Sequence, residues 1–284
     1  MSEAVTQNIS MPQQAYNSAI RAKGLGRLAS NAAIYTFANL ASSAIPFLLL
    51  PLLTRVLTPE EYGIVSMYST LLVALGAVAG LSIHGAVSVR MFDRETNHSQ
   101  YIGTVLQILA LSLFLILIVV LLCAPWLGAW LGLPTRWLVL AVFAAGAQFL
   151  INIRLVIWQI EGKARHYGSL QLIQVVLNVV LSLLLVLHVK LGWEGRLAGI
   201  TVALYLCALW GGGALFYAKR INWHFNREYA RDALRFGIPL MPHAVGSLFI
   251  GMGDRMIIAS QHNLNEVGIY TAAMQLGLVI SIIA

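Results

Sequence analysis

Residues 109–122 read LALSLFLILIVVLL, and this stretch decides the class of fold. Every position except Ser112 is apolar, so the stretch lacks the apolar-polar alternation of strands in an outer-membrane barrel. A helix of ~20 apolar residues spans the hydrocarbon core of a bilayer. Because the uncharged run extends back to Ile102, the sequence predicts a transmembrane helix over residues 102–122.

Uncharged runs of similar length recur along the chain, separated by short polar stretches. Hydrophobic residues make up 59% of the sequence and charged residues 10%, and the mean hydropathy is +0.78, a composition suited to lipid. We therefore expect an all-α polytopic membrane protein with about eight transmembrane helices. The expected spans are residues 32–53, 64–89, 102–122, 137–158, 169–188, 197–217, 238–260 and 267–284.

The basic residues are divided unequally between the two sides of these spans. If the N-terminus is cytoplasmic, 13 of the 18 Lys and Arg residues lie in inner segments or at inner span ends: Arg21, Lys23, Arg27, Arg90, Arg94, Arg154, Lys163, Arg165, Lys219, Arg220, Arg227, Arg231 and Arg235. The outer segments hold Arg55, Arg136, Lys190 and Arg196, and Arg255 lies within a span. By the positive-inside rule, this bias predicts a cytoplasmic N-terminus.

Several functional classes are excluded by the same pattern. The formal charge of +7 is spread between spans and not gathered on one surface, so no nucleic-acid partner is expected. The loops between spans are too short for a soluble catalytic domain, and no GxxxxGK[ST] motif is present to bind ATP. Cys123 and Cys207 have no neighbours at metal-ligand spacing, so no disulfide, metal or other cofactor is expected.

Two charged residues, Asp254 and Arg255, interrupt the seventh expected span. A charge at the bilayer centre costs ~2.5–3.5 kcal/mol on insertion scales, so such residues usually face a bundle interior or a wet cavity. Neighbouring helical positions point about 100° apart, so each residue is expected to find its partner on another helix. Arg255 is therefore a candidate for binding an anionic group; the alternatives are snorkelling and an interhelical lock.

Four further residues are candidates to line a cavity. Arg154 lies near the inner end of the fourth expected span, and Arg90 and His84 lie at the inner part of the second. For Arg90, ordinary anchoring at the membrane interface is the favoured interpretation. His84 and His243 are candidates for proton coupling, because histidine is the side chain whose ordinary charge change falls closest to neutral pH, although a buried histidine is more often simply hydrogen-bonded.

Uncharged polar side chains are concentrated in the fourth and fifth expected spans. Their donors and acceptors match those of sugars, but interhelical hydrogen bonding is the default interpretation for such residues. They are Gln148, Asn152, Gln159, Gln171, Gln174 and Asn178.

Four segments together resemble a known family. The first hairpin contains Leu50-Pro-Leu-Leu-Thr-Arg-Val-Leu-Thr-Pro-Glu-Glu-Tyr-Gly63. The seventh and eighth spans contain Leu234-Arg-Phe-Gly-Ile-Pro-Leu-Met-Pro242, Gly253-Asp-Arg-Met-Ile-Ile258 and Asn265-Glu-Val-Gly-Ile-Tyr270. In order and spacing, these segments resemble the polysaccharide-export family, the Wzx-like O-antigen flippases.

The resemblance implies the fold of the multidrug/oligosaccharidyl-lipid/polysaccharide (MOP) exporter superfamily, in which two six-helix lobes enclose a cationic cavity. The expected division is an N-terminal cytoplasmic segment (1–31), a first lobe (32–217), a cytoplasmic linker (218–236) and the start of a second lobe (237–284). Because the family normally continues for several more spans, we expect the sequence to be truncated at Ala284.

The implied activity is translocation of an undecaprenyl-diphosphate-linked oligosaccharide across the bacterial inner membrane, and not an enzymatic reaction. Arg255, Arg90 and Arg154 would bind the anionic headgroup, and Asp254 would be an ion-pair or coupling partner. The implied partners are this lipid-linked substrate, the bilayer, a polysaccharide polymerase and a chain-length regulator, in O-antigen and lipopolysaccharide synthesis.

Two other functions remain open from the sequence. A cation or drug antiporter of the same superfamily would share the fold, although the Tyr-Gly and Asp-Arg motifs favour the polysaccharide branch. A membrane-embedded polymerase or ligase would share the hydropathy, but ordinarily has a large outer loop carrying Arg and His. No such loop occurs between the expected spans.

Overall fold

The computed structural model describes residues 13–93, 96–217 and 221–283, and the regular structure of these residues is entirely helical. This confirms the expected all-α fold. The helices are α1 (Gln13–Val56), α2 (Pro59–Val78), α3 (His84–Arg90), α4 (His98–Leu122), α5 (Ala124–Leu131), α6 (Thr135–Ile160), α7 (Ala164–Leu183) with a π-helical turn η1 (Leu184–His188), α8 (Gly192–Tyr217), α9 (Arg227–Gln261) and α10 (Leu264–Ile283). Of the expected segments, residues 1–12, 218–220 and 284 lie outside the described residues.

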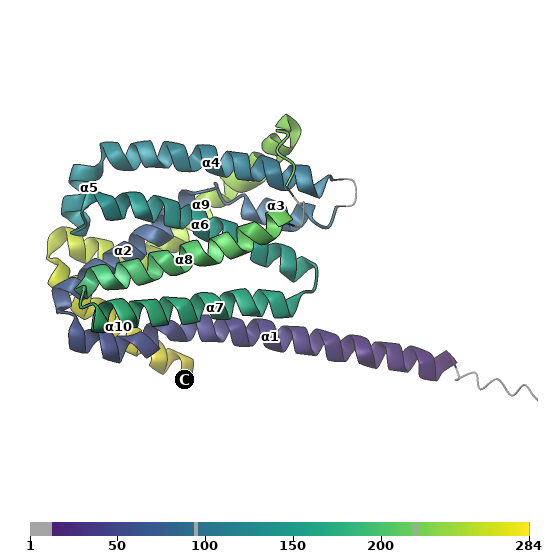
Figure 1. Cartoon of the computed structure of the whole chain (residues 1–284), viewed down its shortest axis with the longest axis horizontal. Helices are drawn as coiled ribbons and strands as arrows, with labels where there is room; N and C mark the ends of the chain where they lie inside the picture. The colour runs from purple at the N-terminus through teal and green to yellow at the C-terminus, as the bar shows by residue number, and fades with distance from the viewer. Residues whose placement is uncertain (1–12, 94–95, 218–220, 284) are drawn as a thin grey trace, which may run out of the picture.

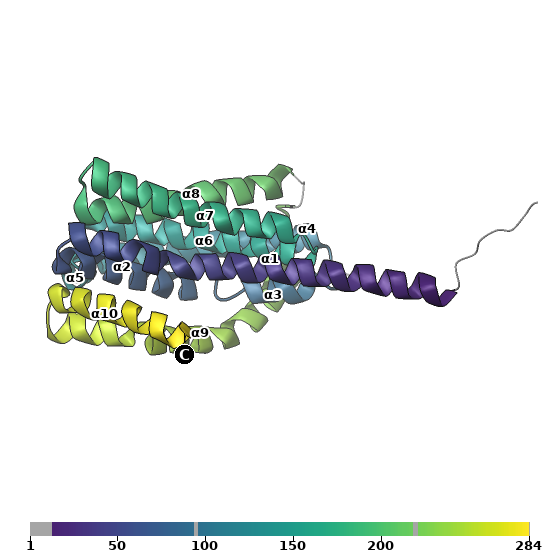
Figure 2. The ribbon, with the colours of Figure 1, turned by 90° about the horizontal axis from the view of Figure 1, so that it is seen from below.

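The long helices run side by side, and the N-terminal part of α1 projects beyond the others (Figure 1). Figure 2 shows α9 and α10 together on one side of the bundle. The α6 helix is the most deeply packed of the long apolar helices, with 67% of its most apolar window buried, whereas the values for α4 and α7 are 28% and 17%. The corresponding value for α9 is 11%, so α9, α7 and α4 are the long apolar helices with the most surface left for lipid.

Six of the eight expected spans fall on helices that are long and apolar enough to cross a membrane, within the ranges that the structure describes. They are Pro59–Ser82, His98–Leu122, Thr135–Ile160, Ala164–His188, Gly192–Tyr217 and Arg227–Gln261. The other two expected spans, residues 32–53 and 267–284, fall on α1 and α10.

The second expected span differs from the structure because it is not one continuous helix. The α2 helix ends at Val78, and the chain passes through Gly80, Leu81 and Ser82 at φ angles of 72°, 51° and 55° before α3 begins. A Cβ at Gly80 would lie 2.3 Å from the ring of Phe149, so only glycine fits there without displacing the ring. Hydropathy could not reveal this turn, because its residues are as apolar as a helix interior.

The start of the seventh span also differs. The α9 helix begins at Arg227, where the side chain of Asn226 accepts hydrogen bonds from the backbone N–H groups of Glu228 and Tyr229. Residues 227–236, which the sequence assigns to a linker, therefore continue without interruption into the apolar part of α9.

The crossing of α2 and α10 brings two backbones unusually close together. A Cβ at Gly63 would lie 1.9 Å from the carbonyl oxygen of Leu264, and a Cβ at Gly268 would lie 1.8 Å from that of Pro59. The contact is reciprocal. Pro59 lies four residues before Gly63 and contacts Gly268, and Leu264 lies four residues before Gly268 and contacts Gly63. Any larger residue at either glycine must push the helices apart.

Polar bonds reinforce the same crossing. The hydroxyl oxygens of Ser66 and Thr271, each three positions after its glycine, are buried and lie 2.8 Å apart. The Tyr62 hydroxyl donates to the Gln275 side-chain oxygen at 2.9 Å. The α2 and α10 helices are thus joined by matched positions.

Candidate functional site

Asp254 and Arg255 face different neighbours, as their helical spacing predicts. Asp254 accepts a short hydrogen bond from the Tyr270 hydroxyl of α10, so this carboxylate does find its partner on another helix. Arg255 instead places its Nη1 2.8 Å from the sulfur of Met252 on its own helix, so the expectation of a partner on another helix is wrong for Arg255. A thioether is a weak acceptor, and the Arg255 Nε has no hydrogen-bond partner among the described residues.

Arg90 is held by a carboxylate. Its Nε and Nη2 donate to the two oxygens of Asp232 on α9 at 2.9 and 2.5 Å, and this hydrogen bonding raises the pKa of Arg90. Tyr101 on α4 also donates to Asp232 at 3.1 Å. Arg90 therefore ties α3 to α9, and its charge is already compensated.

The other predicted residues are dispersed. Arg154 is 7% exposed in α6, and its guanidinium carbon lies 4.2 Å from the ring centroid of Trp158, in a cation–π contact. His84 is exposed and stands edge-on to Phe149 with centroids 6.0 Å apart, and His243 is exposed on α9. Among the contacts of the described residues, only the adjacent Asp254 and Arg255 are joined to each other.

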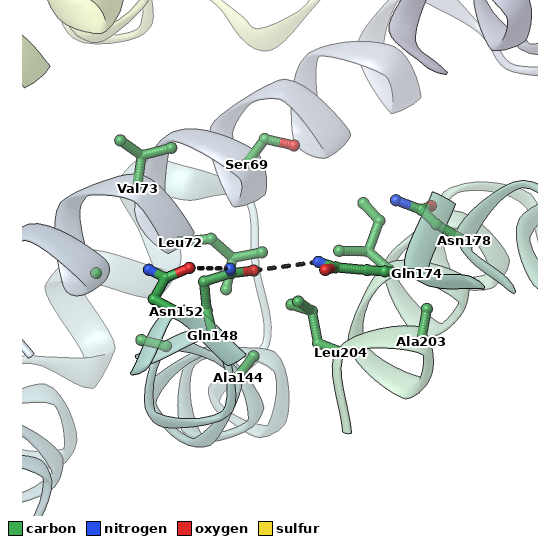
Figure 3. A pocket seen from close by; sticks show the side chains of 13 residues that line it. Ser69, Leu72, Val73, Ala144, Gln148, Asn152, Gln174, Asn178, Ala203 and Leu204 are labelled. Atoms are coloured by element: carbon green, nitrogen blue, oxygen red, sulfur yellow. Dashed lines mark hydrogen bonds between the residues drawn. The ribbon is translucent and has the colours of Figure 1, made fainter. Parts of the chain in front are cut away.

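The first lobe contains a cavity of about 430 Å³ between α2, α6, α7 and α8. Four amide side chains face it, from Gln148 and Asn152 on α6 and from Gln174 and Asn178 on α7 (Figure 3). The rest of the lining is Ser69, Leu72, Val73, Gly76, Ala144, Ala145, Ile200, Ala203 and Leu204. None of these described lining residues is charged.

Three of the amides form a chain across the cavity (Figure 3). Gln174 Nε2 donates to Gln148 Oε1 at 3.3 Å, and Gln148 Nε2 donates to Asn152 Oδ1 at 2.9 Å. At the ends of this chain, the Gln174 amide oxygen and the Asn152 amide nitrogen have no protein partner within the described parts of the chain. The cavity thus offers both an acceptor and a donor, which is the pair of functions that a sugar hydroxyl uses.

Arg196 lies one helical turn from this cavity and was not predicted as a site residue. The sequence placed it in an outer segment, but the structure buries it in α8 at 9% exposed. Its Nη1 donates to Asn178 Oδ1 at 2.6 Å and to Ser182 Oγ at 2.5 Å, so the cavity amide Asn178 is also the partner of a buried cation. Its Nε has no hydrogen-bond partner among the residues described.

One sequence signal could have identified Arg196. It is flanked by Gly195 and Gly199, which form a small-xxx-small pattern typical of tightly packed membrane helices. A Cβ at Gly199 would lie 2.4 Å from the Ser182 hydroxyl oxygen, and one at Gly195 would lie 2.9 Å from the Leu185 carbonyl carbon. The pattern indicates that α8 presses against the end of α7 here, which buries the arginine between them.

Comparison with known proteins gives consistent matches. The family described as "Polysaccharide biosynthesis protein" matches residues 28–284. A protein of the Lsg locus of the bacterium Haemophilus influenzae is 27% identical over 258 residues, which are 88% of this chain and 61% of that protein. The chain therefore spans about three fifths of the length of the curated relatives it matches.

Two solved structures show the same fold. A multidrug resistance MATE family transporter of the MOP superfamily in its inward-facing conformation has a TM-score of 0.61 and 18% identity, covering 84% of this chain and 58% of that one. The outward-facing conformation of a transporter with the same description also has a TM-score of 0.61, with 19% identity over 87% of this chain and 57% of that one. The described helices therefore have the fold of part of a MOP transporter.

Proposed function

Because the chain belongs to the polysaccharide biosynthesis protein family, we propose that the complete protein is a flippase for a polyprenyl-diphosphate-linked oligosaccharide. The chain is a multi-pass membrane protein with a transporter-like fold. On this proposal it lies in the bacterial inner membrane with its N-terminus in the cytoplasm, as the distribution of basic residues favours. Alternating access of the two lobes would carry the glycan across.

The observation that carries the proposal is the neutral, amide-lined cavity of the first lobe. An organic cation would require a carboxylate or an aromatic cage, and the described lining has neither. A chain of amides with an unused donor and an unused acceptor suits uncharged hydroxyl groups. Arg196 beside the cavity would also repel a cation.

The anionic end of the substrate would need a cation elsewhere. Arg255 is the predicted residue best suited to this role, because it is half-buried in α9 and, among the described residues, its guanidinium donates a hydrogen bond only to a thioether. Arg90 is less suited, since Asp232 already neutralises it. On this proposal the headgroup would bind near Arg255 while the sugars occupy the amide cavity.

The proposal is tested with the complete protein in liposomes. The measurement is the rate at which an undecaprenyl-diphosphate-linked oligosaccharide reaches the outer leaflet, where an added lectin can bind it. Gln148→Leu should slow translocation about tenfold, since a lost hydrogen bond is worth ~1 kcal/mol and the apolar side chain leaves Gln174 unpaired. The matched control is Gln159→Leu, an exposed amide on the same helix.

Either of two outcomes would overturn the proposal. In the first, wild-type protein moves an organic cation such as tetraphenylphosphonium but does not expose the oligosaccharide, which would make the protein a cation antiporter. In the second, translocation occurs but is as fast in the Gln148 variant as in the Gln159 control, which would remove the cavity from the transport path.

A further inference from the structure

An apolar groove of about 550 Å³ runs between α4 and α9. Its α4 wall contains Ile108, Leu111 and Leu115, and Leu111 and Leu115 are 60% and 54% exposed. Its α9 wall contains Ala230 and Leu234. Since α4 is among the most apolar and least buried of the spanning helices, this groove opens toward the lipid.

A basic hollow of about 720 Å³ adjoins the groove at the start of α9. Arg227, Arg231 and Arg235 line it, and their spacing of four residues places them on one face of the helix. The groove and the hollow share Ala230 and Leu234, so they form one continuous surface.

The charge of this hollow is only partly compensated. Glu228 is the one carboxylate that lines it, which leaves a net formal charge of two positive units. Asp232, the other nearby acid of α9, is hydrogen-bonded to Arg90 and Tyr101 and also interacts with the charge of Arg235, so it offsets only part of that arginine's charge. The hollow therefore has an excess charge that matches two phosphate groups better than one.

Two aromatic residues indicate where this surface crosses the membrane–water interface. Phe225 lines the end of the groove and is 59% exposed, and Trp223 beside it is 51% exposed. Aromatic side chains concentrate at the boundary between headgroups and acyl chains. With the boundary at these aromatic residues, Arg227 at the start of α9 would lie at headgroup depth, and Leu111 and Leu115 on the α4 side of the groove would lie at acyl-chain depth.

We propose that this surface is the initial docking site for the lipid part of the substrate, with the diphosphate in the arginine hollow and the first isoprene units in the α4–α9 groove, before the headgroup reaches Arg255. The inference rests on the proposed function for the choice of lipid. A polyprenyl diphosphate fits better than a phospholipid for two reasons. It carries two phosphates to match the net charge, and it has a single chain to fill a single groove.

The inference is tested by binding, independently of transport. The complete protein, in phosphatidylcholine vesicles, is labelled with a polyprenyl diphosphate probe that carries a photoreactive group on its first isoprene units. Labelled peptides are then located by mass spectrometry. Labelling should concentrate on α4 around Leu111 and on α9 around Leu234, and unlabelled undecaprenyl diphosphate should prevent it.

Two variants test the two halves of the surface. Leu111→Trp fills the groove, and Arg231→Gln removes the central charge of the hollow. Each variant should weaken probe binding about tenfold, which is the effect of losing one charge-assisted hydrogen bond or an apolar contact of similar strength. The matched controls are Leu122→Trp, which is 77% exposed on the same helix, and Arg165→Gln, an exposed arginine at the start of α7. Binding to the controls should stay within about twofold of wild type.

Three results would overturn the inference. The first is equal weakening in a variant and its control. The second is competition by phosphatidylglycerol as effective as that by undecaprenyl diphosphate, which would make the surface an ordinary contact for anionic lipid. The third is full competition by inorganic pyrophosphate, which would leave the groove without a role.

If wild type translocates oligosaccharide but labels elsewhere, the docking site fails while the proposed function stands. If it labels the groove but moves no oligosaccharide, the proposed function fails.

Discussion

Arg196 and Arg154 are both buried arginines of the first lobe, yet they are stabilised in different ways. Arg154 stacks on Trp158, whereas Arg196 donates to the neutral oxygens of Asn178 and Ser182. A buried cation in lipid is costly unless hydrogen bonds replace its hydration. Arg196 therefore depends strongly on the two oxygens that α7 supplies.

Replacing Arg196 should destabilise the first lobe. Arg196→Ala removes both hydrogen bonds and leaves the buried Ser182 hydroxyl with only its 3.4 Å bond to Asn178 Oδ1, at an expected cost of roughly 1–3 kcal/mol. The measurement is the thermal unfolding midpoint in detergent, which should fall by several degrees, with Arg165→Ala as the exposed control. An unchanged midpoint would mean that Arg196 is not held by these oxygens.

The residue types of the candidate site could be predicted from the sequence, but not their partners. The sequence indicates Arg90, Arg154 and Arg255 as candidates, because a charged side chain near or within a membrane span is costly and usually has a structural or functional role. Asp232 lies on another helix from Arg90, and hydropathy carries no information on which helices are neighbours. Trp158 and Met252 lie on the same helices as Arg154 and Arg255, but whether each guanidinium turns toward them depends on how those helices pack. The amides of the cavity were visible as polar residues, but their convergence depends on the packing of α6 against α7.

Among the elements, the α2–α10 crossing depends on its two glycines. Gly63→Leu places a side chain where the Leu264 carbonyl lies and should separate the helices. In a background with Cys123→Ser and Cys207→Ala, the pair Ser66→Cys and Thr271→Cys should form a disulfide, because the native oxygens are 2.8 Å apart. Adding Gly63→Leu should abolish most of this cross-link on a denaturing gel. Adding Gly76→Leu, where a Cβ meets nothing within 4 Å, should not.

The α3–α9 connection is expected to be weaker. Arg90 and Asp232 are 42% and 32% exposed, so solvent screens their attraction despite the two-pronged geometry. A double-mutant cycle of Arg90→Ala and Asp232→Ala should give a coupling energy of about 0.5–1 kcal/mol in detergent. A coupling indistinguishable from zero would mean that this pair does not join the helices in solution.

Helices could be predicted from the sequence more completely than their interruptions. Runs of apolar residues located every long helix from α4 to α9, because a bilayer admits only backbones that satisfy their own hydrogen bonds. The break between α2 and α3 was missed, since Leu81 and Ser82 adopt positive φ angles that neither residue type favours. Such a turn follows from packing around Phe149 and not from local preference.

At the scale of the whole molecule, the proposed alternating access would require two lobes that move relative to one another. The α2–α10 crossing joins them through backbone contact and through the Ser66–Thr271 bond. In the complete protein, an oxidised Ser66→Cys and Thr271→Cys pair should therefore reduce oligosaccharide translocation at least about tenfold, and a reductant should restore it. Equal rates in the oxidised and reduced states would show that this crossing stays closed throughout the cycle.

The reciprocal form of the crossing relates α2 and α10 by a local two-fold symmetry. Each helix begins after a capping residue, Thr58 or Asn263, and the sequence Glu-Xaa-Gly-Ile starts three residues after the cap. Each glycine contacts the residue directly after the cap of the opposite helix. Residues that contact one another in this pairwise exchanged manner are the signature of a two-fold dimer interface. The crossing therefore has the local two-fold geometry of such an interface, although both of its helices belong to one polypeptide.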